Sequence, residues 1–185
     1  MIRQSRCTAA SARRASIADI GSIFAQARIE AAEDATRLLG RFSLGRIPVD
    51  PFGLARALGV HADRVRLDDD TSGALIKEYC QAPKIVVNAG DGKLRQRFTC
   101  AHELGHYVRR GDEEEYQRIY FRNEASVEGR YPEEVFANEF AGCLLMPEDH
   151  VLALHREGLF AWEMAERFVV SRRAMLRRLR RLGLS

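Results

Sequence analysis

The residues best suited to chemistry in this chain are His102-Glu103-Leu104-Gly105-His106. Residues four apart on an α-helix lie roughly 40° apart around its axis, so both imidazoles project from one face and can share one zinc ion. Glu103 is rotated by about 100° from His102, which lets its carboxylate reach a water molecule in the open coordination position. A catalytic zinc needs three protein ligands, so this motif alone is incomplete.

The third ligand has to come from further along the chain, where four residues are candidates: Glu133, Glu134, His150 and His155. The two histidines follow the break at Pro147 and therefore belong to a different segment. The two glutamates lie at the start of an apolar segment that begins with a proline. Any carboxylate near the N-terminus of a helix is also stabilised by the helix dipole. The glutamates are therefore better placed.

Glu134 is the stronger of the two because Asn138 follows it by four residues. An amide in that position can hydrogen-bond a metal-binding histidine. Both residues are polar interruptions in a helix that is otherwise apolar, whereas Glu139 is expected to face solvent. Two histidines and a glutamate, with a second glutamate as base, form the arrangement of zinc peptidases. The residues therefore predict one Zn²⁺ per chain, with Glu103 as general base and three ligands: His102, His106 and Glu134.

The wider sequence around these residues resembles the ImmA/IrrE family of zinc endopeptidases. The resemblance rests on RQRFTCAHELGH at 95–106, on EVFANEFA at 134–141, on LLMP at 144–147 and on PVDP at 48–51. It extends over about residues 25–184, with shorter matching pieces at 72–74, 85–88 and 164–171. It implies the same three ligands and the same base. It also implies a protein substrate, a helix-turn-helix transcriptional repressor, because studied members of that family cleave such repressors.

Several helices and a small sheet are expected to position these residues. Periodicity predicts helices over 18–39, 94–109 and 132–146, and Asp50, Pro51 and Gly59 delimit a shorter one. Three extended stretches at 60–67, 74–79 and 84–88 predict a small antiparallel meander. The last of them is either an edge strand able to hold an extended peptide or an ordinary core strand. A helical piece from Gly111 and a loop over 124–131 should follow. This order predicts an α+β, zincin-like peptidase fold.

The C-terminal part is expected to be helical over 148–182 and strongly basic. Residues 160–182 have the pattern of a helix, a short turn and a second helix capped by Ser171, resembling a helix-turn-helix. Residues 167–185 hold seven arginines and no acid. The stretch Arg172–Arg181 either contacts nucleic-acid phosphates or is a solvated or protein-docking face, and we favour the second interpretation. The alternative function is thus a non-catalytic DNA-binding or anti-repressor regulator.

Length and composition limit the remaining possibilities. The chain has 185 residues, enough for one domain with its own core. We expect a disordered basic tail over 1–22 and a single zinc metallopeptidase domain over 23–185, with a helical subregion at 148–185. The longest apolar run covers 140–146, far short of the ~20 residues of a membrane span. Four cysteines without a Cys-x-x-Cys pair, and no secretory signal, predict a cytoplasmic protein with reduced thiols.

Two tyrosines, Tyr107 and Tyr131, are candidates to stabilise the oxyanion of a reacting carbonyl, and the sequence does not choose between them. It likewise leaves the substrate's identity and the oligomeric state open.

Overall fold

The computed structural model describes residues 17–42, 46–78, 80–110, 118–121 and 131–184. Along the chain it contains helices α1 (Ile17–Arg41) and α2 (Pro51–Ala57), then strands β1 (His61–Val65), β2 (Gly73–Lys77) and β3 (Lys84–Asn88). Helix α3 (Lys93–Arg110), strand β4 (Arg118–Phe121) and the last four helices follow: α4 (Pro132–Leu145), α5 (Glu148–Arg156), α6 (Ala161–Phe168) and α7 (Arg172–Arg181). The expected α+β class is confirmed.

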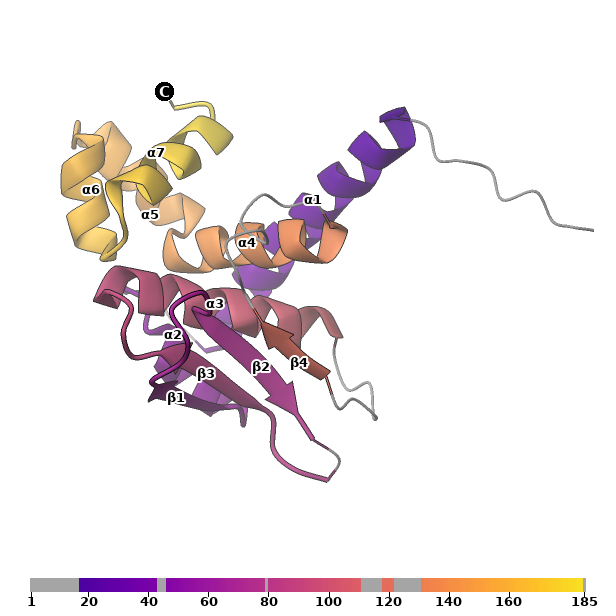
Figure 1. Ribbon diagram of the computed structural model, residues 1–185. Helices are drawn as coiled ribbons and strands as arrows, with labels where there is room; N and C mark the ends of the chain where they lie inside the picture. Colours follow the sequence, from indigo (N-terminus) through magenta and orange to yellow (C-terminus); the bar gives the residue numbers. More distant parts are fainter. Residues whose placement is uncertain (1–16, 43–45, 79, 111–117, 122–130, 185) are drawn as a thin grey trace, which may run out of the picture.

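The helices are stacked on one face of the sheet (Figure 1). Helix α3 lies against β2 and β3, α4 packs on α3, and α1 packs on α4. The face of α1 that is buried carries small residues at helical spacing, namely Ala27, Ala31 and Ala35. Small side chains let two helices approach closely, so α1 covers α4 and leaves α4 an interior helix. Helices α5, α6 and α7 gather at one end of this stack (Figure 1).

The sheet is mixed, with strand order β1-β3-β2-β4. Strand β3 pairs in parallel with β1 and antiparallel with β2, and β2 pairs antiparallel with β4. The expected antiparallel meander is therefore wrong for the first strand, and β3 is a central strand rather than an edge strand. The physical reason is burial: Ile85, Val86 and Val87 of β3 are all buried, which suits a strand covered on both faces.

Gly73 allows the sheet to approach α3 closely. A Cβ atom at this position would lie 2.4 Å from Cγ2 of Thr99 and 2.8 Å from the carbonyl oxygen of Val86. Thr99 is fully buried and precedes Glu103 by one helical turn. This contact therefore sets how deeply the middle of α3 sits on the sheet.

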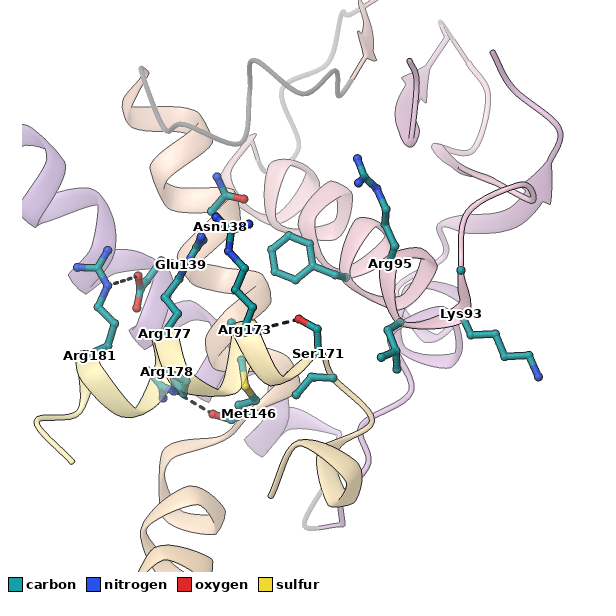
Figure 2. A pocket seen from close by; sticks show the side chains of 16 residues that line it. Lys93, Arg95, Asn138, Glu139, Met146, Ser171, Arg173, Arg177, Arg178 and Arg181 are labelled. Atoms are coloured by element: carbon teal, nitrogen blue, oxygen red, sulfur yellow. Dashed lines mark hydrogen bonds and ion pairs between the residues drawn. The ribbon is translucent and has the colours of Figure 1, made fainter. Parts of the chain in front are cut away.

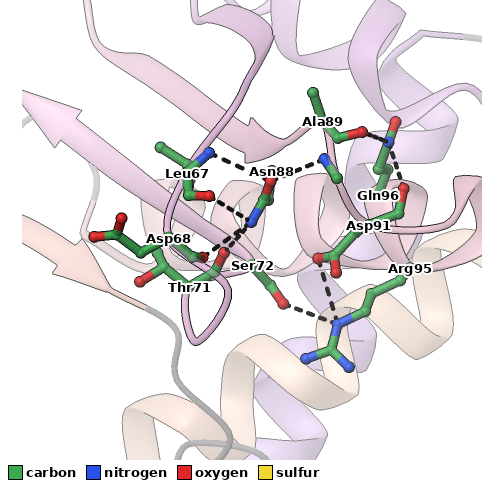
Figure 3. A network of polar contacts seen from close by, with 10 residues as sticks. Leu67, Asp68, Thr71, Ser72, Asn88, Ala89, Asp91, Arg95 and Gln96 are labelled. Atoms are coloured by element: carbon green, nitrogen blue, oxygen red, sulfur yellow. Dashed lines mark hydrogen bonds and ion pairs between the residues drawn. The ribbon is translucent and has the colours of Figure 1, made fainter.

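A buried amide organises the loops that lead into α3 (Figure 3). Oδ1 of Asn88 accepts hydrogen bonds from the backbone N–H groups of Leu67 and Gly90, at 3.3 and 2.9 Å. Its Nδ2 donates to the carbonyl oxygens of Asp68 and Thr71, at 3.1 and 2.8 Å. One side chain at the end of β3 thus satisfies the backbone of the loop between β1 and β2, which would otherwise leave polar groups unpaired.

The predicted helix ends agree with the structure. Oδ1 of Asp50 accepts a hydrogen bond from the N–H of Phe52, and Oγ of Ser171 accepts one from the N–H of Ala174. Gly59, just past α2, has φ of +77°, a conformation that favours glycine.

Other expectations fall partly outside the described residues. These include the helical piece from Gly111, most of the loop over 124–131, and residues 1–16 of the expected tail; residues 17–22 of that segment already belong to α1. Strand β4 was not anticipated. No helix in the described ranges is both long enough and apolar enough to cross a membrane.

Candidate metal centre

The structure brings His102, His106 and Glu134 together. Their potential metal-binding atoms all lie within 4.8 Å of one another. Nε2 of His106 lies 3.1 Å from Nε2 of His102, and the two carboxylate oxygens of Glu134 lie 3.4 Å from Nε2 of His102 and 3.2 Å from Nε2 of His106. Both histidines are buried and Glu134 is half-buried. Two imidazole nitrogens and a carboxylate therefore converge on a common point.

Helix α3 supplies the histidines and a buried glutamate from its interior. His102 and His106 are one turn apart, and their rings meet edge to face with centroids 4.8 Å apart. Glu103, between them, has only 1% of its surface exposed. A deeply buried carboxyl group that is adjacent in sequence to a candidate metal-binding histidine is a candidate for proton transfer.

Gly105 brings α3 and α4 close enough for Glu134 to reach the histidines. A Cβ atom at position 105 would lie 3.1 Å from Cα of Ala137 and 3.0 Å from Cδ1 of Phe140. Ala137 belongs to the turn that follows Glu134 on α4. Because the backbones meet at this point, a Cβ atom at position 105 would require α4, which carries the carboxylate, to shift by a few tenths of an ångström.

Asn138 orients the first histidine. Its Oδ1 lies 3.1 Å from Nδ1 of His102. An amide oxygen can only accept, so this hydrogen bond requires Nδ1 of His102 to carry the proton. The lone pair of the neutral ring is then on Nε2, the atom that faces His106 and Glu134. The ring is thus held in the tautomer that a metal ion needs.

The other candidates for the third ligand lie elsewhere. Glu133 is exposed and forms an ion pair with Arg110 of α3, with the oxygen and nitrogen 3.0 Å apart. His150 and His155 belong to α5 and are not part of the cluster. Adjacent residues on a helix diverge by about 100°, which explains why Glu134 faces the histidines and Glu133 does not.

The residues present fit a divalent metal ion. Burial by itself raises the pKa of the Glu134 carboxyl. Hydrogen bonds and charge interactions with the protonated forms of His102 and His106 lower the pKa by more than burial raises it, so the net shift is downward. The group is thus an ionised carboxylate. A carboxylate and two imidazole nitrogens form a donor set that zinc accepts, and a fourth position would remain open for water or substrate.

The two tyrosines named from the sequence lie in different surroundings. Tyr131 is 69% exposed and immediately precedes α4. Tyr107 is partly buried and packs against the hydrophobic core. Sequence reasoning missed Gly105, whose importance depends on a contact with another helix and has no local signature.

A pocket of about 560 Å³ opens beside the cluster, between α3, α4 and α7 (Figure 2). Asn138 lines it, as does Phe98, whose ring centroid lies 6.3 Å from that of His102. Glu139 was expected to face solvent, but it is half-buried, lines the pocket and lies 3.5 Å from Nε of Arg181. That expectation is wrong because α7 covers this side of α4. Most charged residues of the lining are basic: Lys93, Arg95, Arg173, Arg177, Arg178 and Arg181.

The fold and the cluster together define a site of the metallopeptidase kind, with a paired-histidine helix facing a helix that carries a carboxylate. Residues 55–180 match the family model for the IrrE N-terminal-like domain, Peptidase M78, and the chain therefore belongs to this metallopeptidase family.

The comparison with solved structures agrees on the fold. A Mycobacterium tuberculosis transcriptional regulator is similar, with a TM-score of 0.52 and 16% sequence identity, over 83% of this chain and 46% of that chain. The present chain thus spans about half the length of that protein, and the likeness shows a shared fold. No curated protein gave a significant match.

Proposed function

We propose that this chain is a zinc endopeptidase that hydrolyses a peptide bond in a specific protein. The observation that carries the proposal is the convergence of His102, His106 and Glu134 beside the buried Glu103. Membership of a peptidase family supports the class of reaction. When bound by these residues, zinc would supply a Lewis acid for the peptide carbonyl and would lower the pKa of a water molecule.

Each residue has a separate task in this proposal. His102, His106 and Glu134 hold the metal ion, and Asn138 keeps His102 in the required tautomer. Glu103 takes a proton from the attacking water as the oxygen–carbon bond forms. It then delivers that proton to the amide nitrogen as the carbon–nitrogen bond breaks, so that the products are a carboxylic acid and an amine. The buried position of Glu103 keeps bulk water from competing for this proton.

The proposed substrate is a helix-turn-helix transcriptional repressor in the cytoplasm. The support is the resemblance to the ImmA/IrrE family over the motifs at 95–106 and 134–147. Cleavage of a repressor would change gene expression without any contact between the peptidase and DNA.

The test is to map new protein termini. The zinc-loaded full chain is incubated with an extract of its own host and, separately, with purified helix-turn-helix repressors encoded beside its gene. New N-termini are then labelled and identified by mass spectrometry. We expect one or a few cleavage sites in a repressor that appear with the natural chain and with Glu133→Gln but not with Glu103→Gln. Equal cleavage by Glu103→Gln, or no cleavage beyond a metal-free control, would contradict the proposal.

A further inference from the structure

We propose that the pocket between α3, α4 and α7 receives an acidic segment of the protein substrate, with a carboxylate side chain next to an apolar one. This inference rests on the proposed function, because it assigns the substrate class of the same enzyme. It concerns recognition rather than the bond-breaking step.

The charge of the pocket lining favours an anionic ligand. One acidic residue, Glu139, lines the pocket with six basic ones. Arg173, Arg177 and Arg181 follow one another at intervals of four residues, so they form a line along one face of α7. Arg181 is paired with Glu139, but no carboxylate of the described residues lies within ion-pair distance of Arg173 or Arg177. The lining therefore has an excess of positive charge that an anionic ligand would neutralise.

Arg178, which also lines the pocket, is a buried cation. Only 8% of its surface is exposed, and its Nε donates a hydrogen bond of 3.1 Å to the carbonyl oxygen of Met146 (Figure 2). Within the part of the chain that the structure describes, no carboxylate forms an ion pair with it. A buried cation is costly unless an anion accompanies it. An acidic side chain in the pocket would provide that anion.

The lining also has an apolar part, which consists of Leu94, Phe98, Met146, Val170 and Ala174. A charge-only ligand such as inorganic phosphate would leave this surface uncovered. The volume of about 560 Å³ falls within the roughly 300–1,000 Å³ of pockets that enclose a specific ligand. The chemistry that fits is an anion joined to an apolar group.

Continuity with the metal centre favours a peptide over a free small molecule. Asn138 belongs to the pocket lining and is also hydrogen-bonded to His102. Arg173 and Arg177 extend from α7 towards Asn138 (Figure 2). A peptide seated along these arginines would lie next to Asn138, the residue that also contacts His102.

Selection from a random decapeptide library tests the inference without requiring catalysis. The probe is the library itself, displayed on phage and selected against the immobilised full chain carrying Glu103→Gln. The pocket variant adds Arg173→Glu and Arg177→Glu. The matched control adds Arg172→Glu and Arg180→Glu, which make the same change in net charge at exposed residues of α7 outside the pocket. A second pocket variant carries Arg173→Gln and Arg177→Gln, which remove the positive charges without adding negative ones. Circular dichroism checks that every variant still folds.

We expect the parent and the matched control to enrich peptides with Asp or Glu beside an apolar residue. The pocket variant should lose this preference, and one enriched peptide should bind it at least ten-fold more weakly. The inference would be overturned if the selected peptides showed no acidic consensus, or if the matched control lost the preference for acidic peptides to the same extent. It would also be overturned if an organic anion bound the pocket while no peptide did. If the proposed function is wrong, the cleavage experiment will show no metal-dependent cleavage. The peptide selection does not depend on catalysis, so its result can still be interpreted.

Discussion

Nδ1 of His102 lies 3.1 Å from Oδ1 of Asn138, although the two residues are 36 positions apart in the chain. This hydrogen bond links α3 to α4. In the neutral ring of His102 it places the lone pair on Nε2, the nitrogen that faces Glu134. Asn138 also lines the basic pocket. It therefore connects the candidate metal centre to the surface that we propose for substrate recognition.

Replacing Asn138 tests whether this hydrogen bond supports metal binding. Asn138→Ala should lower zinc affinity by roughly 10–100-fold, the usual effect of losing a partner of a metal-binding histidine. Asn138→Asp keeps an acceptor oxygen and should restore most of the affinity. Competition titration against a zinc chelator measures both variants. Unchanged affinity in Asn138→Ala would mean that His102 is oriented by something else.

The adjacent glutamates of α4 provide a matched pair for the third ligand. Glu134→Ala should lower zinc affinity by several orders of magnitude, because one of three protein ligands is removed. Glu133→Ala should change it by less than about ten-fold, because it removes only an exposed ion pair with Arg110, worth at most ~1 kcal/mol. The same competition titration decides between them. If Glu133→Ala were the more damaging substitution, the assignment of Glu134 would be wrong.

Glu103→Gln should separate metal binding from catalysis. The amide fills the same volume and Glu103 is not one of the proposed ligands, so zinc content and thermal stability should stay close to those of the natural chain. Activity on an identified substrate should fall by ~10²–10⁴-fold or more, since proton transfer is lost. Elemental analysis measures the zinc content, and a cleavage assay on the same preparation measures the activity. Cleavage at the parent rate would exclude Glu103 as the base.

Gly105→Ala tests the close approach of α3 and α4. Alanine favours a helix by up to ~1 kcal/mol relative to glycine, but the new methyl group meets the backbone of Ala137. We expect no net gain in the free energy of unfolding, and a zinc affinity at least ten-fold weaker because Glu134 moves away. Gly142→Ala is the control, since a Cβ there meets nothing within 4 Å. It should stabilise the chain, as measured by denaturant unfolding. Equal stabilisation by both substitutions would show that α4 can shift away from a methyl group at position 105 without loss of stability.

The buried thiols should be inert in the folded protein. Burial raises the pKa of the Cys143 thiol to about 11, so the reactive thiolate forms only well above neutral pH. In a Cys7→Ser, Cys80→Ser variant, a disulfide reagent at pH 8 should label neither Cys100 nor Cys143 until denaturant is added. Labelling of the folded variant should begin only as the pH approaches 11. Rapid labelling at pH 8 would show that these residues are accessible.

Local patterns were sufficient to predict which side chains of a single helix share a face. The phase of α4 separates Glu134 from Glu133, and the four-residue spacing of His102 and His106 puts both on one face of α3. Asp50 and Ser171 cap helices where their sequence context predicted. These features depend on residues within a few positions of one another, which a sequence displays directly.

Contacts between distant segments could not be obtained in this way. The central position of β3 depends on its partners β1 and β2, and three short strands of similar composition are compatible with several orders. The role of Gly105 depends on Ala137 of another helix. The sequence shows the arginines of α7 only as part of one basic helix. In the fold, Arg173 and Arg177 line a pocket together with residues of α3 and α4, whereas Arg172 does not.

A zinc-edge anomalous difference map from crystals of the purified, zinc-loaded chain shows whether His102, His106 and Glu134 hold the metal ion. We expect one strong peak per chain, within roughly 2.0–2.2 Å of Nε2 of His102, Nε2 of His106 and a carboxylate oxygen of Glu134. Crystals of Glu134→Ala should lose most of that peak under the same zinc concentration. A peak at a different group of residues, or no peak between these three side chains, would contradict the account.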